Sequence, residues 1–160
     1  MKLQEEEGLR LGTRLTQAHI NWKTQKMKVN LAVQVFSQSV ANALEYCNLH
    51  LRLPQFQGAE ATVEFIRHVD GAFDVLNSRN IFGRQSKAPL KIETYEAQES
   101  IIKNTNVFLL SLENDSGTPL HKGQRKVGFL GFVLSGRSFL SLYTSLVGFR
   151  PGAPLTYLLG

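Results

Sequence analysis

The chain has 160 residues, of which 42% are hydrophobic and 19% are charged, and its formal net charge is +5. These fractions are typical of a folded globular chain with one sizeable core, and they exclude extensive disorder. The single cysteine, Cys47, excludes an internal disulfide and a thiolate metal cluster, and it favours an intracellular chain. The four histidines show no metal-ligand spacing, so the sequence predicts no metal site.

Charge is unevenly distributed along the chain. Every acidic residue lies at or before Asp115, whereas the cations that follow it are Lys122, Arg125, Lys126, Arg137 and Arg150. A basic C-terminal quarter favours binding to a polyanion, but solvated cations on a helix face would give the same pattern. The polar, acidic start MKLQEEEG predicts no signal peptide.

The first half of the chain predicts two helices. Residues 3–22 carry leucines at helical spacing with three glutamates near the start, where a helix dipole favours acids. Residues 27–50 predict one long amphipathic helix, because apolar side chains recur at steps of three and four. Its expected buried face contains Val29, Ala32, Val33, Phe36, Val40, Ala43 and Cys47.

Breaker-rich loops and further helices alternate after that point. Pro54 and Gly58 predict a loop over 51–61, and the loops at 79–90 and 114–124 are predicted in the same way. Between these loops we expect a helix over 60–78 and another over 91–112. The buried face expected for the first contains Val63, Ile66, Val69, Phe73 and Leu76, and that expected for the second contains Ile92, Tyr95, Ile101, Ile102, Phe108, Leu109 and Leu112.

Residues 127–147 are the most membrane-like segment. Arg137 and four serines interrupt them, and a central arginine is costly in a spanning helix. We therefore predict a buried helix or helix pair and no membrane partner, although the composition also suits a pair of strands. The whole pattern predicts a mainly α single domain.

Several polar groups are candidates for binding chemistry. The chain has no phosphate-binding loop of the common kinds. Asp70 and Asp74 share a helix face at i, i+4, and Lys23, Lys26 and Lys28 precede a predicted helix start, where lysines and free N–H groups can meet phosphate oxygens. Taken alone, each pattern is better explained by solvated surface residues or, for one of the acids, by a helix-end cap.

Three ordered blocks carry a family resemblance. The chain reads GLRLGTRLTQAHINWKTQKMKVNLAVQVFSQSVANALEY, then FIRHVDGAFDVLNSRN, then RKVGFLGFVLSGRSFLSLYTSLV. In this order they resemble P-element-type DNA transposases, including the THAP-domain transposase-like proteins. In that family a mainly helical insertion domain that binds GTP interrupts an RNase H-like catalytic domain.

The resemblance implies a domain organisation and a ligand site. Residues 1–150 would form the GTP-binding insertion domain and 151–160 would begin the return into the catalytic domain, so this chain would contain none of the catalytic acids. Asp70 is expected to be structural. Thr13-Arg14 stands where relatives commonly have Asn-Lys, which keeps a cation but loses an amide. The nucleotide site would comprise Arg14, Lys28, Val29, Ser37, Phe73, Asp74 and Asn77.

The function that the resemblance implies is guanine-nucleotide binding within a nuclear transposase. GTP would be a structural cofactor, with Mg in the full-length protein, and would support DNA binding and homo-oligomeric assembly in cut-and-paste transposition. Two alternatives stay open. The chain could be a decayed or domesticated remnant that acts as a protein-interaction module without nucleotide, or a basic nucleic-acid-binding domain.

Overall fold

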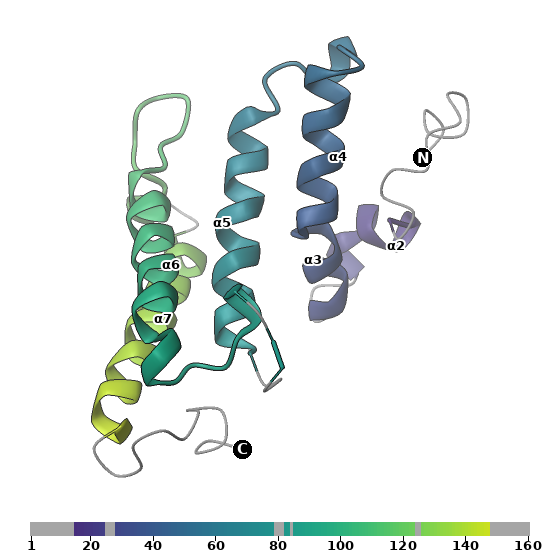
Figure 1. Ribbon diagram of the computed structural model, residues 1–160. Coiled ribbons are helices and arrows are strands. Elements are labelled where there is room, and N and C mark those ends of the chain that lie inside the picture. The colour runs from purple at the N-terminus through teal and green to yellow at the C-terminus, as the bar shows by residue number, and fades with distance from the viewer. Residues whose placement is uncertain (1–14, 25–27, 79–81, 84, 124–125, 148–160) are drawn as a thin grey trace. The chain divides into compact units, whose positions relative to one another are not determined.

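The computed structural model describes residues 15–24, 28–78, 82–83, 85–123 and 126–147, and helices dominate these ranges (Figure 1). Within them the only β-type pairing is an isolated bridge between Glu113 and Pro119. The prediction of a mainly α chain is therefore confirmed for the described ranges. The chain divides into two compact units, Met1–Asp70 and Gly71–Gly160, and helix α5 (Glu60–Leu76) begins in the first and ends in the second.

Short helices open the first unit. The predicted helix over 3–22 lies mostly outside the described residues, and its described end is the four-residue α2 (Gln17–Ile20), followed by a 3-10 helix at Trp22–Thr24. Helix α3 (Val29–Val35) comes next. His19 Nε2 lies 2.9 Å from Gln34 Oε1, so a side-chain contact joins α2 to α3.

The prediction of one long helix over 27–50 is wrong, because the chain breaks between α3 and α4 (Gln38–Leu49). Ser37 has extended backbone angles and occupies the N-cap position of α4, and its carbonyl accepts from the N–H groups of Val40 and Ala41. Its hydroxyl donates to Gln34 O at 2.9 Å. Serine offers the backbone this local alternative to a continuing helix, which periodicity alone does not detect.

Helices α4 and α5 run antiparallel in the first unit and enclose its core. Ala41, Val63 and Ile66 are buried there, with Phe36, Val40 and Leu44 packed around them. The rings of Phe36 and Phe65 meet edge to face, with centroids 5.9 Å apart. Of the buried face expected for residues 27–50, Cys47 is buried as predicted, but Val29 is 61% exposed.

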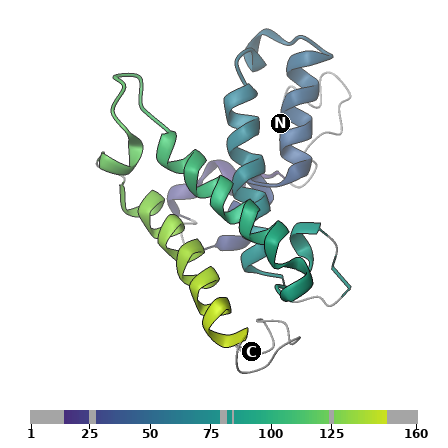
Figure 2. The same ribbon diagram turned by 60° about the vertical axis from the view of Figure 1, so that its left-hand side comes forward.

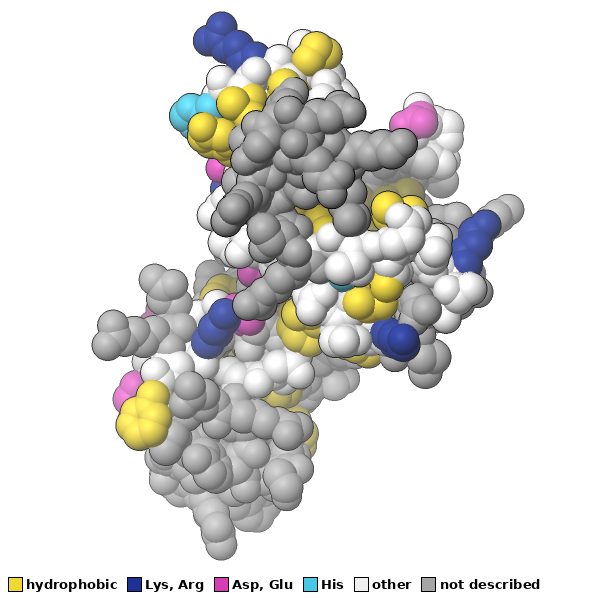
Figure 3. All heavy atoms as spheres, turned by 90° about the vertical axis from the view of Figure 1, so that its right-hand side faces the viewer, with side chains coloured by type: hydrophobic (Ala, Val, Ile, Leu, Met, Phe, Trp, Pro, Cys, Tyr) yellow, Lys and Arg dark blue, Asp and Glu magenta, His cyan; other side chains and the backbone are white. Residues whose placement is uncertain are grey.

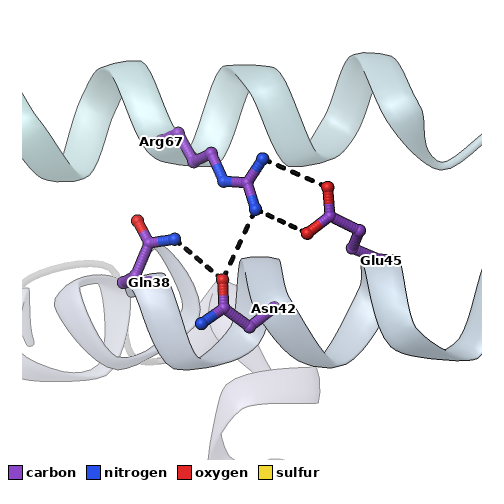
Figure 4. A network of polar contacts seen from close by, with 4 residues as sticks. All are labelled: Gln38, Asn42, Glu45 and Arg67. Atoms are coloured by element: carbon purple, nitrogen blue, oxygen red, sulfur yellow. Dashed lines mark hydrogen bonds and ion pairs between the residues drawn. The ribbon is translucent and has the colours of Figure 1, made fainter.

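A polar network ties the same two helices together on the outside of the core (Figure 4). The Arg67 guanidinium donates to both carboxylate oxygens of Glu45, at 3.3 and 2.7 Å, and to Asn42 Oδ1 at 3.4 Å. Gln38 Nε2 also donates to Asn42 Oδ1, at 2.8 Å. The fork of arginine suits this two-oxygen contact, which fixes the register of α4 against α5.

The loop predicted over 51–61 is observed over 51–59 and contains a 3-10 helix at Pro54–Phe56. Gly58 has a φ of +79°, a conformation that glycine adopts without steric cost. The helix predicted from residue 60 to 78 is observed as Glu60–Leu76.

In the second unit the end of α5 packs with α6 (Ile92–Ser111) and α7 (Lys126–Val147). Figure 2 shows α6 and α7 beside each other. Its core contains the buried residues Ala72, Val75, Ile102 and Leu140. The expected buried face of α5 is therefore wrong in its second half, where Phe73 and Leu76 are only half-buried while Ala72 and Val75 are fully buried.

Helices α6 and α7 cross closely and run antiparallel. Val133, Gly136, Leu140 and Tyr143 are the buried positions of α7, at steps of three and four. A Cβ placed on Gly136 would lie only 2.8 Å from Ile102 Cγ2. Glycine therefore permits this approach between the two helices.

The buried face of α6 is partly polar. Gln98, Thr105 and Asn106 are buried together with Ile102 and Leu109, whereas the predicted core residue Ile92 is 53% exposed. Gln98 Nε2 donates to Ala88 O, so the amide fixes the loop that precedes α6. A search for apolar periodicity overlooks such positions because it counts only apolar residues.

Helix α7 confirms that residues 127–147 form a single helix, but the prediction that this helix is buried is wrong for most of its described positions. Among the described residues, Lys126–Ser145 is the one stretch long and apolar enough to cross a membrane by length and composition, and 22% of that window is buried. Residues 148–160, including the predicted return at 151–160, lie outside the described ranges.

Candidate functional site

The seven residues expected to bind nucleotide fall into three groups. Arg14 lies outside the described residues. Lys28, Val29 and Ser37 belong to the first unit, and Phe73, Asp74 and Asn77 belong to the second. Each described group has its own local geometry.

The first-unit group surrounds helix α3. Lys28 is exposed directly before α3, and Val29 is exposed at its first position. The half-buried Ser37 occupies the N-cap position of α4 without a side-chain capping hydrogen bond. The hydroxyl of Ser37 is already bonded to Gln34 O. The long helix expected after Lys28 is replaced by the seven-residue α3. Lys28 occupies the N-cap position of α3, and its part in phosphate binding stays a prediction.

The second-unit group lies on the last turns of α5. Phe73, Asp74 and Asn77 are spaced i, i+1 and i+4, which places them within about 100° of one another around the helix. Asn77 Nδ2 donates to Phe73 O at 2.9 Å, and the backbone N–H of Asn77 donates to the same oxygen at 3.0 Å. The amide oxygen of Asn77 is therefore directed away from this capping contact.

Asp74 contacts a segment that no sequence pattern predicted to lie near it. The 3-10 helix η3 (Gln85–Lys87) follows α5, and Ser86 Oγ donates to Asp74 Oδ2 at 3.2 Å. Lys87 Nζ lies 3.9 Å from the same oxygen. Both residues lie in the predicted loop 79–90, and no pattern in the linear sequence pairs them with Asp74.

A tyrosine pair lies farther into the second unit. The rings of Tyr95 and Tyr143 stack with centroids 4.7 Å apart, and Tyr95 Oη donates to Glu99 at 2.8 Å. Burial, followed by that hydrogen bond, raises the pKa of Tyr95 to about 12, and burial also raises the pKa of Tyr143. Both hydroxyls therefore stay protonated at neutral pH, and neither is a general base.

A metal centre and a basic surface are two other kinds of candidate site. Across the described ranges, no group of three or more His, Cys, Asp or Glu side chains could hold a metal ion. On the face drawn in Figure 3, the described lysine and arginine side chains stand apart from one another. In the basic C-terminal quarter, Lys122, Lys126 and Arg137 are exposed, while Arg125 and Arg150 lie outside the described residues.

Comparisons with known proteins identify the family. Residues 1–89 match the family model described as TNP-like, GTP-binding insertion domain. The human protein DNA transposase THAP9 is 40% identical over 155 residues, which cover 97% of this chain and 17% of the relative. The chain thus spans about a sixth of the length of that relative. No solved structure matches. The predicted resemblance to P-element-type transposases is confirmed, and the chain belongs to the TNP-like, GTP-binding insertion domain family.

Proposed function

We propose that this chain binds GTP through Arg14, Lys28, Val29, Ser37, Phe73, Asp74 and Asn77, as a structural cofactor of a P-element-like transposase. The observation that carries the proposal is the family match over residues 1–89, because all seven positions lie within it and the family is described as GTP-binding.

The base would be read by the end of α5. Guanine presents two adjacent donors, N1–H and N2–H, and a carboxylate is the side chain that accepts from both. Asp74 supplies that carboxylate, with its side chain 21% exposed, and the neighbouring Phe73 offers a half-buried ring for stacking. A partly buried acceptor discriminates better than an exposed one, because water competes less for it.

The phosphates would be met by cations. Lys28 is exposed, and Arg14 lies in the same matched region. Arginine and lysine both bind phosphate oxygens, arginine in a two-pronged geometry and lysine as a point charge. Mg²⁺ would be held chiefly by the phosphate oxygens and water, which is the usual arrangement for this ion and agrees with the lack of a carboxylate cluster among the described residues.

The role proposed for GTP is structural. Tyr95 and Tyr143 stay protonated at neutral pH, and none of the proposed site residues is a histidine or a second carboxylate that could activate water. Bound nucleotide would instead order the helices that hold it, as a ligand that binds only the folded state stabilises that state.

The wider protein context is proposed by relationship. Residues 1–150 would be the insertion domain and 151–160 the return into an RNase H-like catalytic domain. The whole protein would be a nuclear, homo-oligomeric DNA transposase that binds transposon ends. The 40% identity to a DNA transposase over nearly the whole chain supports this context.

The test is calorimetric titration of the chain with GTP, ITP, XTP and ATP in the presence of Mg²⁺. We expect GTP to bind most tightly. A hydrogen bond to a charged group contributes about 1.5–3 kcal/mol, so inosine, which lacks N2, should bind roughly 10- to 100-fold more weakly. Phosphate release during the same period should match the nucleotide-only control.

Asp74→Asn is the matching substitution. An amide can accept from N1–H and donate to the C2 carbonyl of xanthine, so the preference should move from GTP towards XTP. Absence of heat and of a thermal shift with all four nucleotides at millimolar concentration would reject GTP binding and favour the interaction-module alternative. Unchanged base preference in Asp74→Asn would reject the assignment of Asp74.

A further inference from the structure

Within the described part of the chain, two residues contact the carboxylate of Asp74 through its Oδ2 atom. Ser86 Oγ donates to Oδ2 at 3.2 Å, and the ion-pair distance to Lys87 is also measured to Oδ2, at 3.9 Å. Asp74 and Ser86 belong to the same compact unit, and they come from different elements, α5 and η3.

The serine dominates this arrangement. The Lys87 side chain is 72% exposed, so water and salt screen its attraction to Asp74. Ser86 is half-buried, and its hydroxyl lies within hydrogen-bonding distance. A hydrogen bond has a preferred direction, whereas an exposed ion pair has little directional preference. The hydrogen bond from Ser86 therefore sets the orientation of the carboxylate.

The segment that carries Ser86 is firmly anchored. Leu90 is fully buried and packs with Tyr143 of α7. Gln98 of α6 donates to Ala88 O, and Thr94 Oγ1 donates to Pro89 O at 2.6 Å. Ser86 therefore stands two residues before a stretch fixed by both packing and hydrogen bonds.

An aspartate without such a partner turns easily about its last torsion, since that torsion is broad and the two oxygens are equivalent. A donor on Oδ2 removes the equivalence. The other oxygen, Oδ1, is then presented in a preferred direction before any ligand arrives, which lowers the entropy lost on binding.

We propose that Ser86 is a positioning residue for base recognition: it holds Asp74 by Oδ2 so that Oδ1 accepts from the guanine donors. This inference rests on the proposed function, because it assigns to Ser86 the orientation of a carboxylate already proposed to read the base. Ser86 itself need not touch the nucleotide.

The experiment compares Ser86→Ala, which removes the hydroxyl, with Ser86→Thr, which keeps it. Dissociation constants for GTP and ITP are measured by calorimetry on the whole chain. We expect Ser86→Ala to weaken GTP binding roughly threefold to tenfold, the range expected when one side chain must be ordered on binding, and to reduce the ratio between ITP and GTP. Ser86→Thr should restore most of that ratio.

A double-mutant cycle separates positioning from a general structural role. If Ser86 acts through Asp74, Ser86→Ala should have no further effect on GTP binding in an Asp74→Ala background. Ser138→Ala, at an exposed position of α7, is the control and should bind as the unsubstituted chain does. Lys87→Met should change the GTP dissociation constant less than Ser86→Ala does.

The outcomes are distinguishable. If the unsubstituted chain binds GTP but Ser86→Ala keeps both its affinity and its ITP to GTP ratio, the positioning role is wrong and the proposed function stands. Equal weakening of GTP and ITP, or the same loss in the Asp74→Ala background, also overturns positioning. If the unsubstituted chain binds no guanine nucleotide, the proposed function fails, and the role of Ser86 fails with it.

Discussion

In the first unit, α4 and the start of α5 enclose three buried apolar side chains, and a polar network of Arg67, Glu45 and Asn42 joins the helices at the surface. In the second unit, α6 and α7 approach so closely that a glycine is required at the crossing, and polar residues share the buried face. Both units use helix pairs of similar periodicity. The difference is that only the second pair, among the described residues, has a buried glycine at its crossing and polar side chains on its buried face.

The largest effects are expected from truncating the two cores. Ile102→Ala in the second unit and Ile66→Ala in the first each remove a nearly fully buried side chain, and each should lower the free energy of unfolding by about 2–5 kcal/mol. Hydrogen exchange should locate the effect, since Ile66→Ala should increase exchange chiefly in α4 and Ile102→Ala chiefly in α6. Equal increases in both helices for both variants would show that the two units open together.

Alanine substitutions of two glycines on α7 are expected to give the next largest change in the free energy of unfolding. They test how closely α6 and α7 approach each other. Gly136→Ala places a methyl group 2.8 Å from Ile102 Cγ2, and overpacking of this kind costs about 1–3 kcal/mol. Gly131 is the matched control, because nothing lies within 4 Å of a Cβ there and alanine favours the helix by up to about 1 kcal/mol.

Denaturant unfolding of the two variants should therefore give changes of opposite sign. Gly131→Ala should raise the free energy of unfolding, and Gly136→Ala should lower it. Stabilisation by both alanines would show that α6 and α7 do not approach each other as described.

The smallest effect is expected at the surface network of the first unit. The hydrogen bond from Arg67 is the main cause that holds the pKa of Glu45 below its ordinary value. A carboxyl whose pKa is lower in the folded state stabilises that state above its unfolded pKa and loses this contribution as the pH falls through the folded pKa. Arg67→Met should return the pKa of Glu45 towards its ordinary value, as followed by NMR of the carboxyl carbon.

Stability at neutral pH should change little in Arg67→Met, because both side chains are about 40% exposed and the pair is screened. Gln38→Ala serves as the control, since it removes a neighbouring amide without touching Glu45. A Glu45 pKa that does not respond to Arg67→Met would mean that the two side chains do not meet in solution.

The same comparison shows which parts of the fold could be predicted. The helices over 60–76 and 92–111 were predicted to within two residues at each end, because their apolar rows are long and loops with Gly or Pro bound them. The break at Ser37 was not predicted. Periodicity continues through it, and the extended backbone of Ser37, whose hydroxyl donates to Gln34 O, leaves no signal in the spacing of apolar residues.

The candidate site could be predicted as a set of residues but not as a geometry. Motif resemblance selected Asp74 in the last turn of α5 and Asn77 directly after it, and the family match covers both positions. It did not select Ser86, whose relevance comes only from its contact with Asp74 across twelve positions of sequence. Lys28 was expected to stand at the start of a long helix, and it stands instead at the start of the seven-residue α3.

The sequence by itself determined the family and most of the helices, since the backbone hydrogen bonds of a helix join residues four apart and leave a periodic record in composition. The tertiary structure decided which face of α5 is buried at Ala72 and Val75, why α7 has a glycine at position 136, and which donor holds Asp74. These features depend on contacts between residues far apart in the chain. Such contacts follow from how side chains of different helices fill the same space, which no local pattern records.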